Sequence, residues 1–463
     1  MQFVDYDFDV AAFERGVEDF LTRYPDTQRL ELLLVDINGA LRGKWLPVSS
    51  LKKLSKGTFR IPRTACFADI WSDDTPELGL GLDVGDPDGI CLPIIETLAP
   101  VPWASVPSAQ MLLTMIDQAD MRPCQYAPRV TLQKQLSRFA AQGLKPVVAT
   151  ELEFYFIDPV RRADGEPQRP LDANGERLRE DQQYSMALLE QYDAVLQDIL
   201  DTAQLQNLPV DTTIAECGPG QFEINLLHCD DALLAADQAI LLKRLIKCVA
   251  RRHGLRASFM AKVYAEEMGN GLHVHASLND ASGHNIFSSD NGEIHPQLAH
   301  AVAGLLKTMQ ATQLVYAPHA NSYRRYAPGF FAPVSPCWGY DHRAAAVRVP
   351  SIDGADARLE HRVSGADANP YLVIAAVLAG MHRGLADAQM PQAALSDETD
   401  LSALVPMTRH WAIAIEQMEQ SDFVAEYFGS EMQRVFCGVK HSEEQTFANW
   451  ISRLEYDTYL LKV

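Results

Sequence analysis

A long apolar run free of charged residues is missing from the sequence. The main apolar stretch, residues 371–381, ends at His382 and Arg383, well short of the roughly 20 apolar residues that a helix needs to cross a bilayer. The first seven residues, Met-Gln-Phe-Val-Asp-Tyr-Asp, contain two aspartates and no basic residue, whereas a secretory signal begins with basic residues before its apolar run. We therefore expect no membrane helix and predict a cytoplasmic protein.

Paired cysteines and an excess of basic residues are missing as well. The eight cysteines lie between Cys66 and Cys437 without a CxxC spacing, which argues against both a disulfide framework and a zinc ribbon. Lysine and arginine total 40 against 61 acidic residues, a formal net charge of −21, so nonspecific nucleic-acid binding is disfavoured. The chain also lacks the GxxxxGK[ST] pattern of a P-loop. An acidic balance would help attract a cationic substrate, but solubility alone is the commoner reason for it.

The length of 463 residues and the 47% share of hydrophobic residues allow two domains and a large core. Up to about residue 120, short strand-like runs such as 30–36 alternate with turns such as Asn38-Gly39. Beyond that point amphipathic helices are predicted at 184–200, 232–251, 295–314 and from Pro370 onward. We predict an α+β protein with a strand-rich domain over residues 1–120 and a larger α+β domain over residues 121–463.

One predicted strand, residues 147–156, carries two carboxylates on the same face. Alternation along a strand places Glu151 and Glu153 on one side and apolar residues on the other. Two neighbouring carboxylates that are buried must share protons, meet cations or bind metal, because an isolated buried charge is costly. A solvated strand edge would explain the pair equally well if it stood alone.

Three further segments place charged or imidazole side chains together. Residues 216–223 hold Glu216 and Glu223 on either side of a Gly-Pro-Gly turn, which lets the two carboxylates converge. Residues 269–277 place His273 and His275 on one strand face beside glycines that allow close backbone approach. A structural role is the alternative for a histidine pair of this kind. In residues 358–362, Glu360 alternates with two arginines on one face.

Five glutamates with one or two histidines suit a hard divalent cation such as Mg²⁺ or Mn²⁺, whereas Zn²⁺ would favour more histidine or cysteine. Four arginines accompany them, and their planar donors match carboxylates and phosphates: Arg325, Arg343, Arg348 and Arg362. Metal ligands combined with convergent arginines point to phosphoryl transfer, where catalysis consists mostly of positioning and charge neutralisation.

Together these segments resemble the glutamine synthetase superfamily. The resemblance runs in order through residues 35–44, 151–153, 216–225, 271–275, 321–325, the pair Arg343 and Arg348, and 358–371. It implies an N-terminal β-grasp domain over residues 1–120, followed over residues 121–463 by a glutamine synthetase-type catalytic α+β domain with a curved antiparallel sheet. It also implies a homo-oligomer, a dodecamer of two stacked hexamers, in which Asp36 would reach the active site of the adjacent subunit.

The resemblance also implies roles for individual residues in a reaction that uses ATP and two or three Mg²⁺ or Mn²⁺ ions. Ligands of the metal nearer glutamate would be Glu153, Glu216 and Glu223, and ligands of the metal nearer the nucleotide would be Glu151, His273 and Glu360. Glutamate and its acyl phosphate would contact Gly269, Arg325 and Arg362, and the nucleotide side would include His275, Ser277, Arg343 and Arg348. In the implied reaction the γ-carboxylate of glutamate attacks ATP, and an amine then displaces phosphate from γ-glutamyl phosphate.

Two departures from the family pattern bear on the amine. Ammonium-using members carry a glutamate in a Pro-Gly-aromatic-Glu-Ala-Pro run, whereas residues 328–333 here place Phe331 at that position. A phenyl ring offers no charge for ammonium but an apolar surface for the methylenes of a larger amine. Met268 replaces an asparagine that contacts glutamate in the family, although Gly269 is kept. The chain thus resembles the γ-glutamylpolyamine or γ-glutamylputrescine synthetase branch, which serves putrescine and polyamine catabolism.

Two other functions stay open at this point. The first is synthesis of glutamine from ammonium with a rebuilt ammonium site, to which Asp36 of a neighbouring subunit would contribute. The second is a noncatalytic structural or sensory role, which the complete ligand set disfavours.

Overall fold

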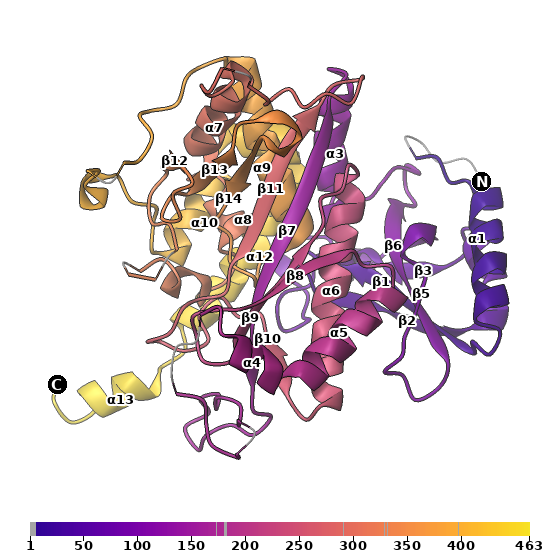
Figure 1. The fold of residues 1–463 in the computed structure, drawn as a ribbon. Coiled ribbons are helices and arrows are strands. Elements are labelled where there is room, and N and C mark those ends of the chain that lie inside the picture. The colour runs from indigo at the N-terminus through magenta and orange to yellow at the C-terminus, as the bar shows by residue number, and fades with distance from the viewer. Residues whose placement is uncertain are drawn as a thin grey trace.

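Two β-sheets and the helices between them organise the chain (Figure 1). The computed structural model describes residues 6–172, 174–179, 183–289, 291–327, 329–330, 332–396 and 398–463. The first sheet lies within residues 29–117 and the second within residues 145–361. The residues that bear the expected chemistry fall almost entirely on the second sheet and on the loops at its end.

The first sheet is built from β1 (Arg29–Val35), β2 (Leu41–Pro47), β3 (Arg60–Pro62), β4 (Asp88–Pro93), β5 (Ala99–Pro100) and β6 (Ser108–Asp117). Its strand order is β2-β1-β6-β4-β3, with β5 paired to β6, and only the β1–β6 pair is parallel. The β1–β2 hairpin turns at Asn38-Gly39, where Gly39 has a φ of 73°. A left-handed residue at a tight turn favours glycine, as the sequence predicted.

The second sheet contains β7 (Lys145–Ile157), β8 (Val210–Ala215), β9 (Gln221–Leu226), β10 (Arg256–Ser258), β11 (Leu272–Asn279), β12 (Trp338–Tyr340), β13 (Val347–Ser351) and β14 (Arg358–His361). Its order is β12-β13-β14-β11-β7-β9-β8, with β10 paired to β7. All pairs are antiparallel except β12–β13. The long central strand β7 thus joins the two halves of the sheet.

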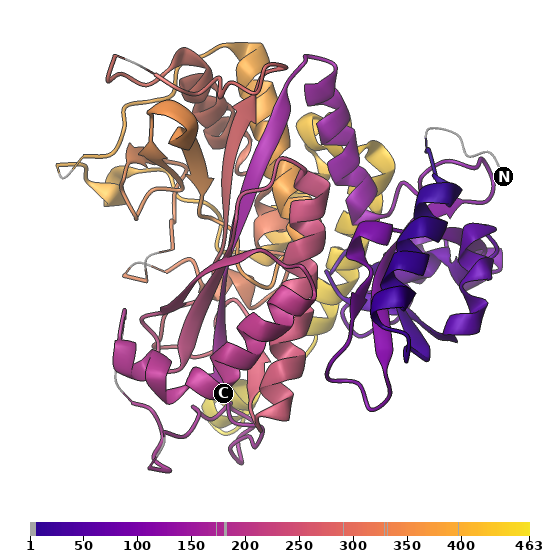
Figure 2. The same ribbon diagram turned by 45° about the vertical axis from the view of Figure 1, so that its right-hand side comes forward.

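Helices cover one face of the second sheet and leave the other face to loops (Figure 2). The helices of the described residues are α1 (Val10–Arg23), α2 (Lys52–Ser55), α3 (Pro128–Ala140), α4 (Met186–Gln191), α5 (Asp193–Leu205), α6 (Ala232–Arg252), α7 (Pro296–Thr308), α8 (Gln313–Tyr316), α9 (Pro370–Asp387), α10 (Trp411–Glu419), α11 (Asp422–Phe428), α12 (Ser430–Ala448) and α13 (Arg453–Tyr459). Of these, α3 and α6 pack on β7. The last helix, α13, projects away from the body of the molecule near the C-terminus (Figure 1).

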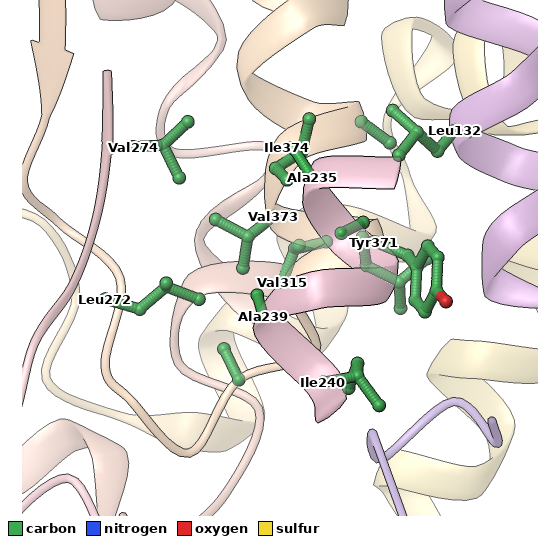
Figure 3. Close-up of a cluster of buried hydrophobic side chains, with 14 of the residues drawn as sticks. Leu132, Ala235, Ala239, Ile240, Leu272, Val274, Val315, Tyr371, Val373 and Ile374 are labelled. Atoms are coloured by element: carbon green, nitrogen blue, oxygen red, sulfur yellow. The ribbon is translucent and has the colours of Figure 1, made fainter. Parts of the chain in front are cut away.

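The centre of the core lies between β11 and helices α3, α6, α8 and α9 (Figure 3). Apolar side chains of these elements are buried together, among them Leu132, Ala239, Leu272, Val315 and Val373. Helix α9 is apolar around most of its circumference because it is covered on all sides. It begins at Pro370, where the missing N–H of proline costs nothing, and the Asn369 side chain accepts a hydrogen bond from the Tyr371 amide.

Glycines allow α7 and α9 to pack closely. A β carbon at Gly304 on α7 would overlap the backbone of Gly380 and Gly384 on α9. Because the obstacle is backbone rather than a flexible side chain, neither helix can move aside without disturbing the core. Small residues at this contact therefore set the distance between the two helices.

A fully buried ion pair connects the first sheet to the C-terminal helices. Lys440 and Glu443 of α12 lie 2.8 Å apart with no exposed surface on either side chain. Lys440 also donates to the Asn38 side chain, and the Ile70 amide donates to Glu443 at 2.8 Å. Since a buried charge is stable only when paired and hydrogen-bonded, this cluster ties the β1–β2 turn and the loop at residue 70 to α12.

Two of the predicted helices differ from those in the structure. The helix predicted over 184–200 is interrupted at Tyr192 between α4 and α5, and the helix predicted over 295–314 ends at Thr308 before the short α8. No helix within the described residues has the length and hydropathy of a membrane span. None of the eight cysteines forms a disulfide, and all but Cys229 are buried.

Candidate active site

The register of the second sheet brings the predicted ligands side by side. In the β7–β9 pair Glu153 lies opposite Glu223, and in the β7–β11 pair Glu151 lies opposite His273. His275 then lies opposite Glu360 in the β11–β14 pair. Directly paired residues share a face of the sheet, so one row of carboxylates and imidazoles crosses four strands on the face away from the helices.

Several side chains in this row contact one another directly. Glu151 accepts hydrogen bonds from His273 Nδ1 at 3.0 Å and from His275 Nε2 at 2.8 Å. His273 also lies 3.7 Å from Glu153 and 3.8 Å from Glu360. Two groups have possible ligand atoms that all lie within 4.8 Å of one another: Glu151, Glu223 and His273, and Glu151, His275 and Glu360. Either group could hold a metal ion.

Charge repulsion within the cluster is large on the β9 side. Burial, together with the nearby charges of Glu151, Glu153 and Glu216, raises the pKa of Glu223 to about 10. Burial and the Glu153 carboxylate raise the pKa of Glu216 to about 7. Like charges held this close favour either protonation or a cation. A divalent ion bound by oxygen atoms would remove the repulsion and keep the carboxylates ionised.

On the β11–β14 side the carboxylates are already compensated. Burial alone would raise the pKa of Glu151, but hydrogen bonds from His273 and His275 hold that pKa well below its usual value. Burial acts in the same direction on Glu360, but the nearby Arg362, His275 and His273 together outweigh it and lower the pKa of Glu360 to about 2. The ligand atoms are carboxylate oxygens and imidazole nitrogens, a donor set that fits Mg²⁺ or Mn²⁺.

The four predicted arginines lie around this cluster, and the charge of Arg343 acts to lower the pKa of Glu216. Arg348 donates to Glu360 at 2.7 Å, and Arg362 also pairs with Glu360. The buried Arg325 donates to the Val363 carbonyl at 2.8 Å, which fixes its direction. The fourth, Arg343, is exposed, and its carbonyl accepts from Arg362 Nε at 3.2 Å. The guanidiniums thus line the β13–β14 side, where an anionic ligand would be neutralised.

The remaining predicted residues are placed as follows. A β carbon on Gly269 would lie 2.5 Å from the Ala261 carbonyl oxygen and 2.9 Å from Arg325 Cγ, so only glycine fits against that arginine. Ser277 is partly exposed and follows His275 on the same face of β11. Phe331 lies outside the described residues, and its effect on the amine stays a prediction.

Asp36 has a role within its own chain. Its fully buried carboxylate accepts from the Asn38 and Ala40 amides at 2.9 and 2.8 Å and from Arg42 Nε at 2.8 Å. Burial raises the pKa of this carboxyl to about 6. These contacts close the β1–β2 turn, and the expected reach into another subunit stays a prediction.

Three residues for which no role was predicted orient side chains of this site. Arg358 Nε donates to His275 Nδ1 at 3.3 Å, which leaves the proton of a neutral His275 on Nε2, facing Glu151. Gln221 and Asn270 connect the segments beneath Glu153. Gln221 could have been predicted from the sequence, because it precedes Glu223 by two residues on one strand and its side chain therefore lies on the same face.

Comparison with known proteins identifies the fold. The protein-family model for the glutamine synthetase catalytic domain matches residues 125–459 of the chain. The structure also resembles GmaS in complex with ADP, with a TM-score of 0.83 and 26% identity over 96% of this chain and 99% of that chain. GmaS without ligand gives a TM-score of 0.81 and 26% identity, over 95% and 98% of the two chains. The mixed α/β fold with curved sheets is therefore that of the glutamine synthetase catalytic domain.

Sequence relatives extend over nearly the whole chain. Gamma-glutamylputrescine synthetase PuuA of Escherichia coli (strain K12) is 40% identical over 455 residues, 97% of this chain and 95% of that protein. Glutamate–isopropylamine ligase of a Pseudomonas species is 32% identical over 375 residues, 79% of this chain and 80% of that protein. Glutamine synthetase of Pyrococcus abyssi (strain GE5 / Orsay) is 30% identical over 448 residues, 95% and 93% of the two chains. The chain belongs to the glutamine synthetase family.

Proposed function

We propose that this protein is an ATP-dependent ligase that joins the γ-carboxylate of L-glutamate to an organic amine, putrescine or another polyamine, through γ-glutamyl phosphate. The observation that carries the proposal is the 40% identity, from end to end, with a gamma-glutamylputrescine synthetase. A relative named as a glutamate–isopropylamine ligase and one named as a gamma-glutamylethanolamide synthetase support the broader class of amine-ligating enzymes.

The acidic cluster is proposed to hold two or three Mg²⁺ or Mn²⁺ ions. One group of ligands would be Glu153, Glu216 and Glu223, and the other Glu151, His273 and Glu360. The side chains whose ligand atoms lie within 4.8 Å of one another are grouped differently, as Glu151, Glu223 and His273 and as Glu151, His275 and Glu360. When bound, these ions would neutralise the transferred phosphoryl group and hold it in line with the attacking carboxylate. The raised pKa values of Glu216 and Glu223 support this proposal, because their carboxylates repel one another without a cation.

The arginines would position the two substrates. Arg325 and Arg362, with Gly269, would hold glutamate and later its acyl phosphate, while Arg343 and Arg348, with His275 and Ser277, would contact ATP. A planar guanidinium can bind two oxygens of a carboxylate or phosphate at once. Arg348 and Arg362 are already held by Glu360, and Arg325 by a backbone carbonyl, so these side chains would lose little conformational freedom when a substrate binds. In the second step an amine would lose a proton, attack the acyl phosphate and release phosphate.

The rest of the proposal concerns organisation. Residues 1–120 would form a β-grasp domain and residues 121–463 the catalytic domain, and subunits would assemble as two stacked hexamers in the cytoplasm, with Asp36 near the adjacent active site. A mixed sheet in which β1 lies parallel to β6 supports the first part.

The decisive experiment measures phosphate release and the amide product by mass spectrometry with ATP, Mg²⁺ and glutamate. Ammonium is compared with putrescine, cadaverine, spermidine, spermine and simple monoamines, with an amine-free reaction as the blank. Turnover that is greatest with a diamine or polyamine would support the proposal. Preference for ammonium would identify a glutamine synthetase, and no turnover with any amine would refute the ligase.

A further inference from the structure

Gln221 is a buried residue that links the two halves of the proposed site without belonging to either. It is the first residue of β9 and only 1% exposed. It precedes Glu223 by two positions, so both side chains lie on the face that carries Glu151 and Glu153. None of the predicted roles uses it.

The amide of Gln221 makes contacts with three different segments. Its Oε1 accepts from the Gly218 amide at 3.0 Å, within the turn that separates Glu216 from Glu223. Its Nε2 lies 3.0 Å from Asn270 Oδ1, 3.1 Å from the Gly269 carbonyl and 3.4 Å from Glu153 Oε2. Since the amide has two protons, the two shorter contacts dominate.

The orientation of this amide is fixed from both sides. Asn270 is fully buried, and its Nδ2 donates to the carbonyls of Met260 at 2.9 Å and Ser258 at 3.2 Å. Its Oδ1 must therefore be the acceptor for Gln221. At the other end the Gly218 amide can only donate, so Gln221 Oε1 must accept. If the Gln221 amide were flipped, its Nε2 would face the Gly218 N–H and its Oε1 would face Asn270 Oδ1, and neither pair can form a hydrogen bond.

The neighbouring backbone is equally constrained. The Gly271 amide donates to Glu153 Oε2 at 2.8 Å, so the segment that Gln221 holds at residues 269–270 also orients a proposed metal ligand. A β carbon at Gly218 would overlap the Tyr155 hydroxyl, which itself donates to the Met268 carbonyl at 2.9 Å. The turn and the 268–271 segment thus meet with little room for adjustment.

We infer that Gln221 is a positioning residue that sets the distance between the carboxylates around the 217–220 turn and the glutamate-binding segment at Gly269. Metal affinity and glutamate affinity would then depend on the same amide. Partners that orient metal ligands typically change metal affinity by about 10- to 100-fold when they are removed. This inference rests on the proposed function, which supplies the metals and the glutamate.

The test replaces the amide by an apolar side chain of similar length, Gln221→Met. Mn²⁺ binding to the full-length protein is titrated by the electron paramagnetic resonance signal of free Mn²⁺, and the KM for glutamate is measured at saturating Mg²⁺, ATP and amine. We expect a rise in both the Mn²⁺ Kd and the glutamate KM of about 10- to 100-fold. The KM for ATP should change far less.

A matched control separates positioning from loss of stability. Gln135 on α3 is also 1% exposed and bonds to two backbone carbonyls, those of Thr131 and Tyr427. Gln135→Met should lower the thermal midpoint to a similar degree and leave the Mn²⁺ Kd unchanged. Equal effects of both substitutions on Mn²⁺ binding would overturn the inference, as would wild-type Kd and KM values in Gln221→Met.

A second variant covers the case in which Gln221→Met does not fold. Gln221→Glu keeps the acceptor for the Gly218 amide and removes the donated bonds to Asn270 and Gly269, so it should weaken glutamate binding as well; wild-type affinities would again contradict the inference.

Mn²⁺ binding can be measured without any amine substrate, so it does not depend on the proposed reaction. If the wild-type protein ligates no amine, the proposed function fails, while the Mn²⁺ comparison still decides the role of Gln221.

Discussion

Replacing Glu360 by alanine should be the most damaging single change in the cluster. The carboxylate has no exposed surface in the folded chain, accepts from Arg348 at 2.7 Å, and pairs with Arg362. It also faces His273 at 3.8 Å. The substitution Glu360→Ala removes a proposed metal ligand and, at the same time, leaves the buried Arg362 guanidinium without its counter-ion, whereas Arg348 keeps its ion pair with Asp341.

Two separate losses follow, and their sizes can be approximated. Breaking a buried charge pair by removing one partner costs about 3–5 kcal/mol of stability, because the remaining charge stays desolvated. Loss of a metal that neutralises the transferred phosphoryl group costs several kcal/mol of transition-state stabilisation, and about 4 kcal/mol corresponds to roughly a 10³-fold lower rate. Stability is measured by urea unfolding of the metal-free protein, and activity by phosphate release.

A surface pair provides the control. Glu431 and Arg434 on α12 form an ion pair at 3.0 Å with about two fifths of each side chain exposed, and such pairs contribute about 1 kcal/mol or less. Glu431→Ala should therefore leave both stability and activity close to wild type. Near-normal phosphate release by a folded Glu360→Ala variant would refute the proposed metal role. Unchanged unfolding would refute the claim that Arg362 depends on this carboxylate.

Three further predictions concern the core, the pH dependence and the amine. Gly304→Val should destabilise the protein by about 2 kcal/mol or more in urea unfolding, because the added carbons overlap the α9 backbone; a stabilised variant would contradict the packing argument. Burial, with Lys247 nearby, lowers the pKa of Lys243 to about 7, so the unfolded chain binds more protons between pH 7 and about 10.4. Stability should rise with pH in that window by up to about 1.4 kcal/mol per unit, and Lys243→Met should remove this rise. Phe331→Glu should shift amine preference from putrescine towards ammonium in the phosphate-release assay, and an unchanged preference would place selectivity elsewhere.

The sequence predicted the parts of the fold that depend on short-range pattern. Alternation over residues 147–156 identified β7 and the face on which Glu151 and Glu153 lie, and the burial along that strand follows the same alternation. The prediction of one continuous helix over 184–200 was wrong, since the helix is interrupted at Tyr192. No glycine or proline marks that break, and the apolar period continues through it. Local pattern therefore carried no signal for this break.

The candidate site shows a similar division. Residues of the right type, such as Glu223 and His273, can be recognised in separate segments, but their contact depends on the pairing order β9-β7-β11-β14. Pairing between strands far apart in the sequence cannot be obtained from periodicity. The bonds of Gln221 to Asn270 and Gly269 also join segments about fifty residues apart, so they became visible only in the structure.

The row of ligands across four strands also has a consequence for how the chain folds. Residues 151, 223, 273 and 360 come together only after strands widely separated in sequence have paired in the correct register, and closing such long loops is slow. Repulsion among the carboxylates opposes the final closure, and a cation that binds only the closed sheet favours it by mass action. We therefore expect Mg²⁺ or Mn²⁺ in the buffer to raise the yield of refolded protein, so that the cation would act in the assembly of the enzyme before it acts on any substrate.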